Sequence, residues 1–149
     1  GFKAQELSGT VWAFARLGAS SPSLLQAVAQ EAVPKVGTFA PQNLSNIAWA
    51  FATLAWEVPE LFDSLGAEAS ARLGEMKLQE LSNFAWSFAT VDTPRTYVLR
   101  AAEAELAARL QGLQARLPAT AAADIALTAL GLLWALRFGG ALSQETLAL

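Results

Sequence analysis

The sequence predicts an all-α fold, an α-solenoid of stacked antiparallel helical hairpins with a 37-residue repeat and about 3.5 repeats. Only 10 Gly and 6 Pro occur in 149 residues and alanine is abundant, a composition that favours helix. Three blocks align without gaps, and their tryptophans are 37 residues apart: FKAQELSGTVWAFARL (2–17), FAPQNLSNIAWAFATL (39–54) and MKLQELSNFAWSFATV (76–91). Apolar residues between the blocks recur at helical spacing, and no segment has the alternation typical of a strand.

The aligned blocks are expected to form the first helix of each hairpin. At about 100° per residue, one side of the helix predicted within 39–54 gathers large apolar residues, which we expect to face the second helix: Leu44, Ile47, Ala48, Phe51 and Leu54. Ala50 and Ala52 lie on the flanks of this side, where small side chains allow neighbouring first helices to approach closely.

The segments 21–37 and 58–74 are expected to form second helices, with Pro22 and Pro59 at their starts. Gly37 and Gly74 suit the far ends, where a left-handed cap residue is wanted. Pro34 should end the first of these helices early or bend it. In the third unit the second helix is expected over 96–112.

We predict one helical-repeat domain over 1–149, with repeats at 2–38, 39–75 and 76–112 and a degenerate one at 113–149, and we expect it to be a fragment of a longer array. The degenerate unit has Trp134 out of register. Within it, 121–138 is apolar apart from Asp124, Thr128 and Arg137, and we expect a buried helix there rather than a membrane span. The first residues do not have the pattern of a signal peptide, so no targeting segment is expected.

A polar and aromatic stripe lies opposite the apolar side of the first helices. In the second unit it is Gln42, Asn46, Trp49 and Thr53, and it recurs in the other two as Gln79, Asn83, Trp86 and Thr90, and as Gln5, Gly9, Trp12 and Arg16. The indoles would offer flat stacking platforms and the amides a donor and an acceptor each, as base recognition requires.

A structural interpretation of the same stripe competes with this one and is favoured by the sequence alone. Each Trp would be a wedge between repeats, and the amides would form a buried ladder. Truncating a wedge would cost stability, about 3–5 kcal/mol, whereas truncating a platform would cost binding. Gln5, Gln42 and Gln79 also lie near helix starts, where a side chain can cap a backbone N–H.

The composition argues against catalysis and against a metal or cofactor site. The chain has no Cys and no His, which removes the common zinc ligands and the most frequent general base. Glu57 and Glu60 lie at a helix start, where the helix dipole accounts for them. We therefore expect no enzyme activity, no cofactor and no small-molecule substrate.

The net charge of −3 argues mildly against nucleic-acid binding, which usually comes with a basic excess. The basic residues of the chain cluster only in the last third, as Arg95, Arg100, Arg109 and Arg116, and Glu103 and Glu105 interrupt them.

The repeated block FxPQxLSNxAWAFATL resembles the octotricopeptide repeat family, including the chloroplast translation-factor relatives that carry such arrays and the organellar proteins in which related arrays stand beside RAP domains. The pattern covers residues 2 to 112, and Phe39, Pro41, Gln42, Asn46 and Trp49 fit it. The resemblance implies an α-solenoid that binds single-stranded organellar RNA, in a chloroplast or mitochondrion.

Two functions therefore stay open. One is an array that binds single-stranded RNA through the stripe to support organellar gene expression. The other is a non-catalytic protein-binding scaffold, or a peripheral subunit of a large organellar complex, which the low-charge, acidic composition fits better.

Overall fold

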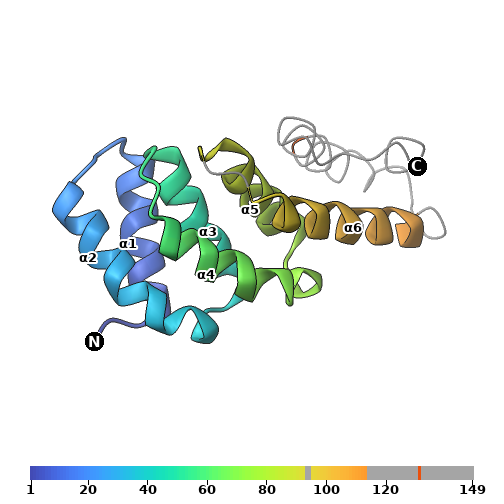
Figure 1. Ribbon diagram of the computed structural model, residues 1–149, viewed down its shortest axis with the longest axis horizontal. Helices are drawn as coiled ribbons and strands as arrows, with labels where there is room; N and C mark the ends of the chain where they lie inside the picture. Colours follow the sequence, from blue (N-terminus) through green and yellow to red (C-terminus); the bar gives the residue numbers. More distant parts are fainter. Residues whose placement is uncertain (93–94, 114–130, 132–149) are drawn as a thin grey trace.

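The computed structural model describes residues 1–92, 95–113 and 131, and within these residues the fold is all-α with no strand. Two 3₁₀ segments, η1 (Val33–Thr38) and η2 (Leu73–Glu75), accompany six helices: α1 (Ala4–Arg16), α2 (Pro22–Ala32), α3 (Pro41–Thr53), α4 (Pro59–Ser70), α5 (Leu78–Thr90) and α6 (Thr96–Leu113). They form three consecutive hairpins, α1–α2, α3–α4 and α5–α6, which follow one another along the molecule (Figure 1).

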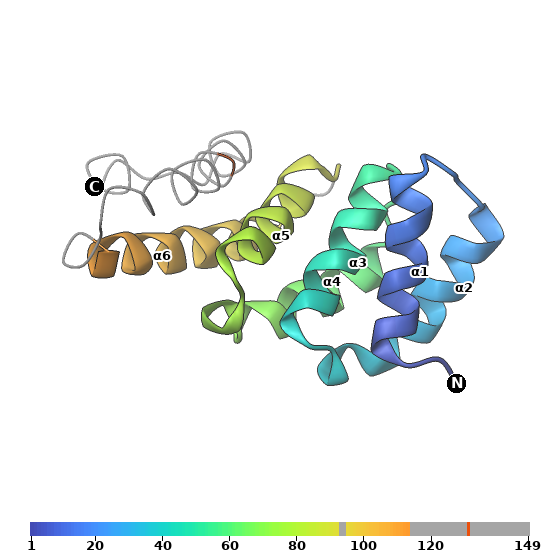
Figure 2. The same cartoon turned by 180° about the vertical axis from the view of Figure 1, so that it is seen from behind.

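The first helices of the three hairpins form one layer. They start at Ala4, Pro41 and Leu78, which are 37 residues apart, and each has 13 residues. α3 packs against α1 on one side and against α5 on the other (Figure 2). The second helices form the other layer, in which α4 contacts α6. We call these the first-helix layer and the second-helix layer.

The second helices begin as predicted and end differently. Pro22 and Pro59 are the first residues of α2 and α4, and α2 stops before Pro34, where η1 continues the chain. The prediction of left-handed caps at Gly37 and Gly74 was wrong. Both glycines lie in the 3₁₀ segments, which satisfy the last carbonyls of the helix by tighter bonds. Among the described residues the positive φ values occur at Gly18 and Ala55, in the turns that follow α1 and α3.

The core lies between the two layers. The side of α3 predicted to face the second helix is buried at Leu44, Ile47, Ala48 and Phe51, while Leu54 at the helix end is half-buried. Phe88 of α5 meets Phe62 of α4 edge to face, with ring centroids 5.3 Å apart, and so joins the second and third hairpins.

Gly66 allows α6 to approach α4 closely. It is buried on α4, and a Cβ built there would lie 2.7 Å from Tyr97 Oη, 2.9 Å from Val98 Cγ2 of α6 and 3.2 Å from Phe88 Cε1. The Tyr97 side chain could turn away, but Val98 and Phe88 are short or buried, so a larger residue would push α6 away from α4.

The degenerate unit predicted at 113–149, with Trp134 and the apolar segment 121–138, lies almost wholly outside the described residues. Within the described ranges, no helix combines the length and the apolar character needed to cross a membrane.

Candidate binding surface

The predicted stripe residues lie at the surface of the first-helix layer, which we call the Trp face. On α3 and α5, three stripe residues are exposed and five are half-buried. The exposed ones are Gln42, Thr53 and Gln79, and the half-buried ones are Asn46, Trp49, Asn83, Trp86 and Thr90. No stripe residue is buried, so the amides do not form a ladder inside the core. Trp49 also packs against the core with part of its ring, and thus has a structural role besides its exposed edge.

The first hairpin contributes the most open part of the Trp face. Trp12 is 42% exposed, and Gln5, Gly9 and Arg16 beside it are exposed as well. The guanidinium carbon of Arg16 lies 5.7 Å from the centroid of the Trp12 ring, within the range of a cation–π contact. This places the one cation of the predicted stripe directly on an indole.

On α5 the stripe residues are held by local hydrogen bonds. Gln79 Nε2 donates to Asn83 Oδ1 at 3.0 Å, and Thr90 Oγ1 donates to the carbonyl of Trp86, also at 3.0 Å. The Asn83 amino group and the Gln79 carbonyl keep hydrogen-bonding capacity toward a ligand.

The prediction that the stripe glutamines cap their helices was wrong by one residue. Gln5, Gln42 and Gln79 are second helical residues, and only the third reaches back to the N–H ahead of the helix. That bond is made by their neighbours: Glu6 accepts from the Lys3 N–H at 2.8 Å, Asn43 from Ala40 at 3.2 Å and Glu80 from Lys77 at 2.9 Å. The glutamine side chains are therefore not needed for capping.

Buried serines hold the first helices together, a role the sequence analysis missed. Asn43 Nδ2 of α3 donates to Ser8 Oγ of α1 at 3.0 Å, and Ser45 Oγ of α3 donates to the Glu80 carbonyl of α5 at 2.8 Å. Ser8 and Ser45 are each 1% exposed. The signal was available, since the Leu-Ser pair recurs unchanged in all three blocks.

A second recurring contact closes each hairpin, and the sequence analysis missed it as well. A base near the end of each second helix pairs with a Glu four residues earlier, as Lys35–Glu31, Arg72–Glu68 and Arg109–Glu105. Each base also donates to a carbonyl ahead of a first helix: Lys35 to Phe2 at 3.0 Å, Arg72 to Phe39 at 2.8 Å and Arg109 to Leu73 at 2.9 Å. We call these three pairs the carbonyl clamps.

The clamps shift the pKa values of some of their members. Hydrogen bonding to Lys35 lowers the pKa of Glu31, and hydrogen bonding to Arg72 lowers the pKa of Glu75, which lies three residues after that arginine. Glu75 and Glu68 together raise the pKa of Arg72. The charged forms of Glu31, Arg72 and Glu75 are therefore favoured.

The arginine cluster near the end of the chain does not form a cationic stripe. Arg95 is only 6% exposed, and its guanidinium contacts Asp63 at 2.6 Å and Glu57 at 3.1 Å. Burial disfavours its charged form, but the hydrogen bonds to Asp63 and Glu57 outweigh this and raise the pKa of Arg95. Arg109 belongs to a clamp, and Arg116 lies outside the described residues.

The negative charge of the chain is concentrated away from the Trp face. The three aligned blocks carry Lys3, Arg16 and Lys77 against Glu6 and Glu80, a net charge of +1. Residues 55–75, which include α4, carry five acidic side chains against Arg72 alone, a net charge of −4. The total of −3 therefore understates how favourable the Trp face is for an anionic ligand.

In the described part of the chain, no group of three or more acidic side chains is placed to hold a metal ion. Comparison with known proteins gives no assignment, because no protein-family model and no curated protein matches this chain.

Proposed function

We propose that this chain is a segment of an α-solenoid that binds single-stranded RNA on its Trp face. The 37-residue spacing of α1, α3 and α5 and the packing of α3 between the other two support the stacked architecture. The resemblance of the aligned blocks to octotricopeptide repeats supports RNA as the ligand and an organelle, a chloroplast or mitochondrion, as the place.

The observation that carries the proposal is the accessibility of the stripe on a surface without excess negative charge. Each hairpin contributes one stripe indole that is exposed or half-buried, and each of these has an amide or a cation near it. A base stacked on an aromatic ring contributes about 1–3 kcal/mol to binding. Three such platforms along one layer would hold an extended strand, since every base has a face that can stack.

The charge of the Trp face predicts how such binding depends on salt. Lys3, Arg16 and Lys77 are the basic side chains of the blocks, so few phosphates would be neutralised. We expect the slope of log K against log salt to stay near −2, about 0.7 per phosphate contacted. Stacking rather than ion pairing would then supply most of the affinity.

The test uses fluorescence anisotropy with a labelled random-sequence single-stranded RNA of about 20 nucleotides, matching the stacking mode of recognition. Trp49→Ala and Trp86→Ala should each weaken binding by about 5- to 150-fold, the range that 1–3 kcal/mol per stacked base gives. Circular dichroism should show that helix content is kept below the unfolding transition.

Tyr97 supplies the matched control for this test. It is 49% exposed and lies on α6, in the second-helix layer, so Tyr97→Ala removes an exposed aromatic ring from the other side of the fold. Binding should be unchanged in this variant. Equal loss in Tyr97→Ala, or no loss in either Trp variant, would contradict the proposal.

A protein-binding scaffold is the second candidate, and the acidic second-helix layer favours it. The excess charge of −4 over residues 55–75 lies on and around α4, where a basic partner protein would be attracted. This candidate predicts no measurable RNA affinity at physiological salt. It also predicts capture of a basic organellar protein that is lost when Glu60, which is exposed, is changed to Lys.

Both candidates are binding functions, and we propose no catalytic step for this chain. The absence of His and Cys from the sequence supports that choice, because the usual nucleophile–base pairs cannot be assembled from it.

A further inference from the structure

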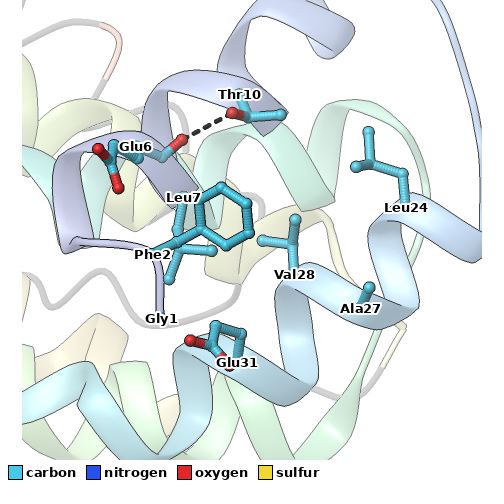
Figure 3. Close-up of a pocket in the computed structure, with 9 residues that line it drawn as sticks. All are labelled: Gly1, Phe2, Glu6, Leu7, Thr10, Leu24, Ala27, Val28 and Glu31. Atoms are coloured by element: carbon cyan, nitrogen blue, oxygen red, sulfur yellow. Dashed lines mark hydrogen bonds between the residues drawn. The ribbon is translucent and has the colours of Figure 1, made fainter.

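The side of the first hairpin that lies away from α3 and α4 is largely apolar and is not covered by another helix of the described chain. We call this side the outer face. A cavity of about 350 Å³ opens between α1 and α2, and it is lined mainly by apolar side chains from both helices. Figure 3 shows the Phe2 ring beside Leu7 in the gap that faces Val28 and Leu24 of α2. Of the four large apolar residues exposed in the described part of the chain, three belong to this hairpin: Trp12 on the Trp face, and Phe2 (66%) and Leu17 (81%), which lie just before and after α1.

The second hairpin shows what covers the equivalent face. The residues 37 positions after Phe2, Thr10, Ala13 and Leu24 are Phe39, Ile47, Ala50 and Leu61, and each is at most 1% exposed. Leu54, the counterpart of Leu17, is half-buried. Asn43 reaches from that side of α3 to Ser8 of α1 at 3.0 Å, and Ala50, seven residues further, lies on the same side. The first hairpin is what buries this face of the second.

The outer face keeps the residue types of a buried face. Phe2, Ala13, Leu17 and Leu24 match Phe39, Ala50, Leu54 and Leu61. The polar residues of the face are Glu6, Thr10 and Glu31, and the second hairpin has Asn43, Ile47 and Glu68 at these positions, so an apolar residue is replaced by a polar one at Thr10. A terminal capping unit of a stack would have a polar outer face. The first hairpin therefore has the composition of an internal unit.

We propose that the outer face of the first hairpin is a docking surface for another helical hairpin of the same 37-residue kind. This inference rests on the proposed stacked architecture and not on RNA binding. The docked hairpin would continue the α1–α3 interface outward: its first helix would present a buried Ser to Glu6, as α1 presents Ser8 to Asn43, and its apolar side would cover Phe2, Leu17 and the cavity.

The experiment adds such a hairpin to the chain and asks whether the face becomes buried. A copy of residues 39–75 is placed directly ahead of Phe2, which preserves the 37-residue register. Ala13→Asp is then made with and without the added hairpin. Ala13 is exposed, so the substitution should lower the unfolding midpoint little in the original chain, and by at least about 3 °C more in the extended one. Amide exchange in α1 should also slow.

Two controls make the result specific. Ser45→Lys and Ala52→Lys within the added copy should abolish the extra cost of Ala13→Asp, because they place charge on the side that would meet α1. Ala50→Asp in the original chain tests the stacking itself, since Ala50 is fully buried between α3 and α1. If Ala50→Asp were as harmless as Ala13→Asp, the stacked architecture would fail, whatever the added hairpin did.

Two results would overturn the docking proposal. One is an equal, small cost of Ala13→Asp with and without the added hairpin while Ala50→Asp remains harmful. The other is a dimer of the original chain in sedimentation velocity that Leu17→Asp dissociates, because it would assign the face to a second copy instead.

Discussion

The contacts of the first-helix layer and of the second-helix layer are made by different kinds of residue. The first-helix layer is held by small and neutral groups, namely alanines and the buried serines Ser8 and Ser45. The second helices use charged groups instead: the carbonyl clamps tie each of them to the start of its own hairpin, and Arg95 joins the second and third hairpins through Asp63 and Glu57. The difference teaches that, among the described residues, most ionic interactions lie within single hairpins, which leaves the Trp face nearly neutral and its aromatic groups accessible.

The largest expected effect on stability comes from the core between the two layers around Phe88, which we call the seam. Phe88→Ala should lower the free energy of unfolding by about 3–5 kcal/mol, because Phe88 is fully buried against Phe62 and Phe84 and truncation leaves a cavity. Urea denaturation followed by circular dichroism measures it. Phe2→Ala removes the same ring from an exposed position and should cost far less; a similar cost for the two would mean that the seam does not hold the layers.

A smaller effect is expected from the ionic side of the comparison. Arg95→Ala should lower the free energy of unfolding by about 1–3 kcal/mol, since it removes the charge-assisted bond to the largely buried Glu57 carboxylate, while Asp63 stays hydrated. Arg100→Ala on exposed α6 surface is the control and should change stability by no more than about 0.5 kcal/mol. If both arginines proved equally dispensable by urea denaturation, the second-helix layer would not depend on its ion pairs.

The smallest expected effect is the pH dependence of stability that comes from the ionised Glu side chains near the second helices. The pKa values of Glu31 and Glu75 are lowered in the folded chain from their usual 4.5, so they stabilise the fold above that pH and lose this contribution as pH falls through the folded values. The chain has no His, the side chain whose ordinary pKa lies nearest neutral pH. The thermal unfolding midpoint should be flat from about pH 6 to 8 and fall below about pH 4.5. A clear step between pH 6 and 7 would contradict the ionic assignment.

The sequence predicted the helices well because their signals are local and repeated. The three aligned blocks match α1, α3 and α5, and Pro22 and Pro59 mark the starts of α2 and α4. The stripe residues lie at the surface because the helical wheel separates them from the Leu and Phe side, which needs no tertiary information.

The sequence predicted the polar contacts poorly because their partners are remote or lack a side chain. The clamps contact backbone carbonyls, such as that of Phe39, which no residue type identifies. A Glu and a base four residues apart also resemble an ordinary solvated pair on a helix. The capping prediction at Gln42 missed the residue that caps, Asn43, by one position, because capping depends on where the helix begins.

The central claim is that single-stranded RNA contacts the indoles of the first-helix layer, and indole N–H signals in two-dimensional NMR test it most directly. On addition of a random-sequence single-stranded RNA of about 20 nucleotides, the signals of Trp12, Trp49 and Trp86 should move, as stacking on each ring requires. Trp56 lies after α3 and outside the stripe, and its signal should stay in place. RNA that binds while the three stripe signals remain unchanged, or that shifts Trp56 alone, would contradict the account.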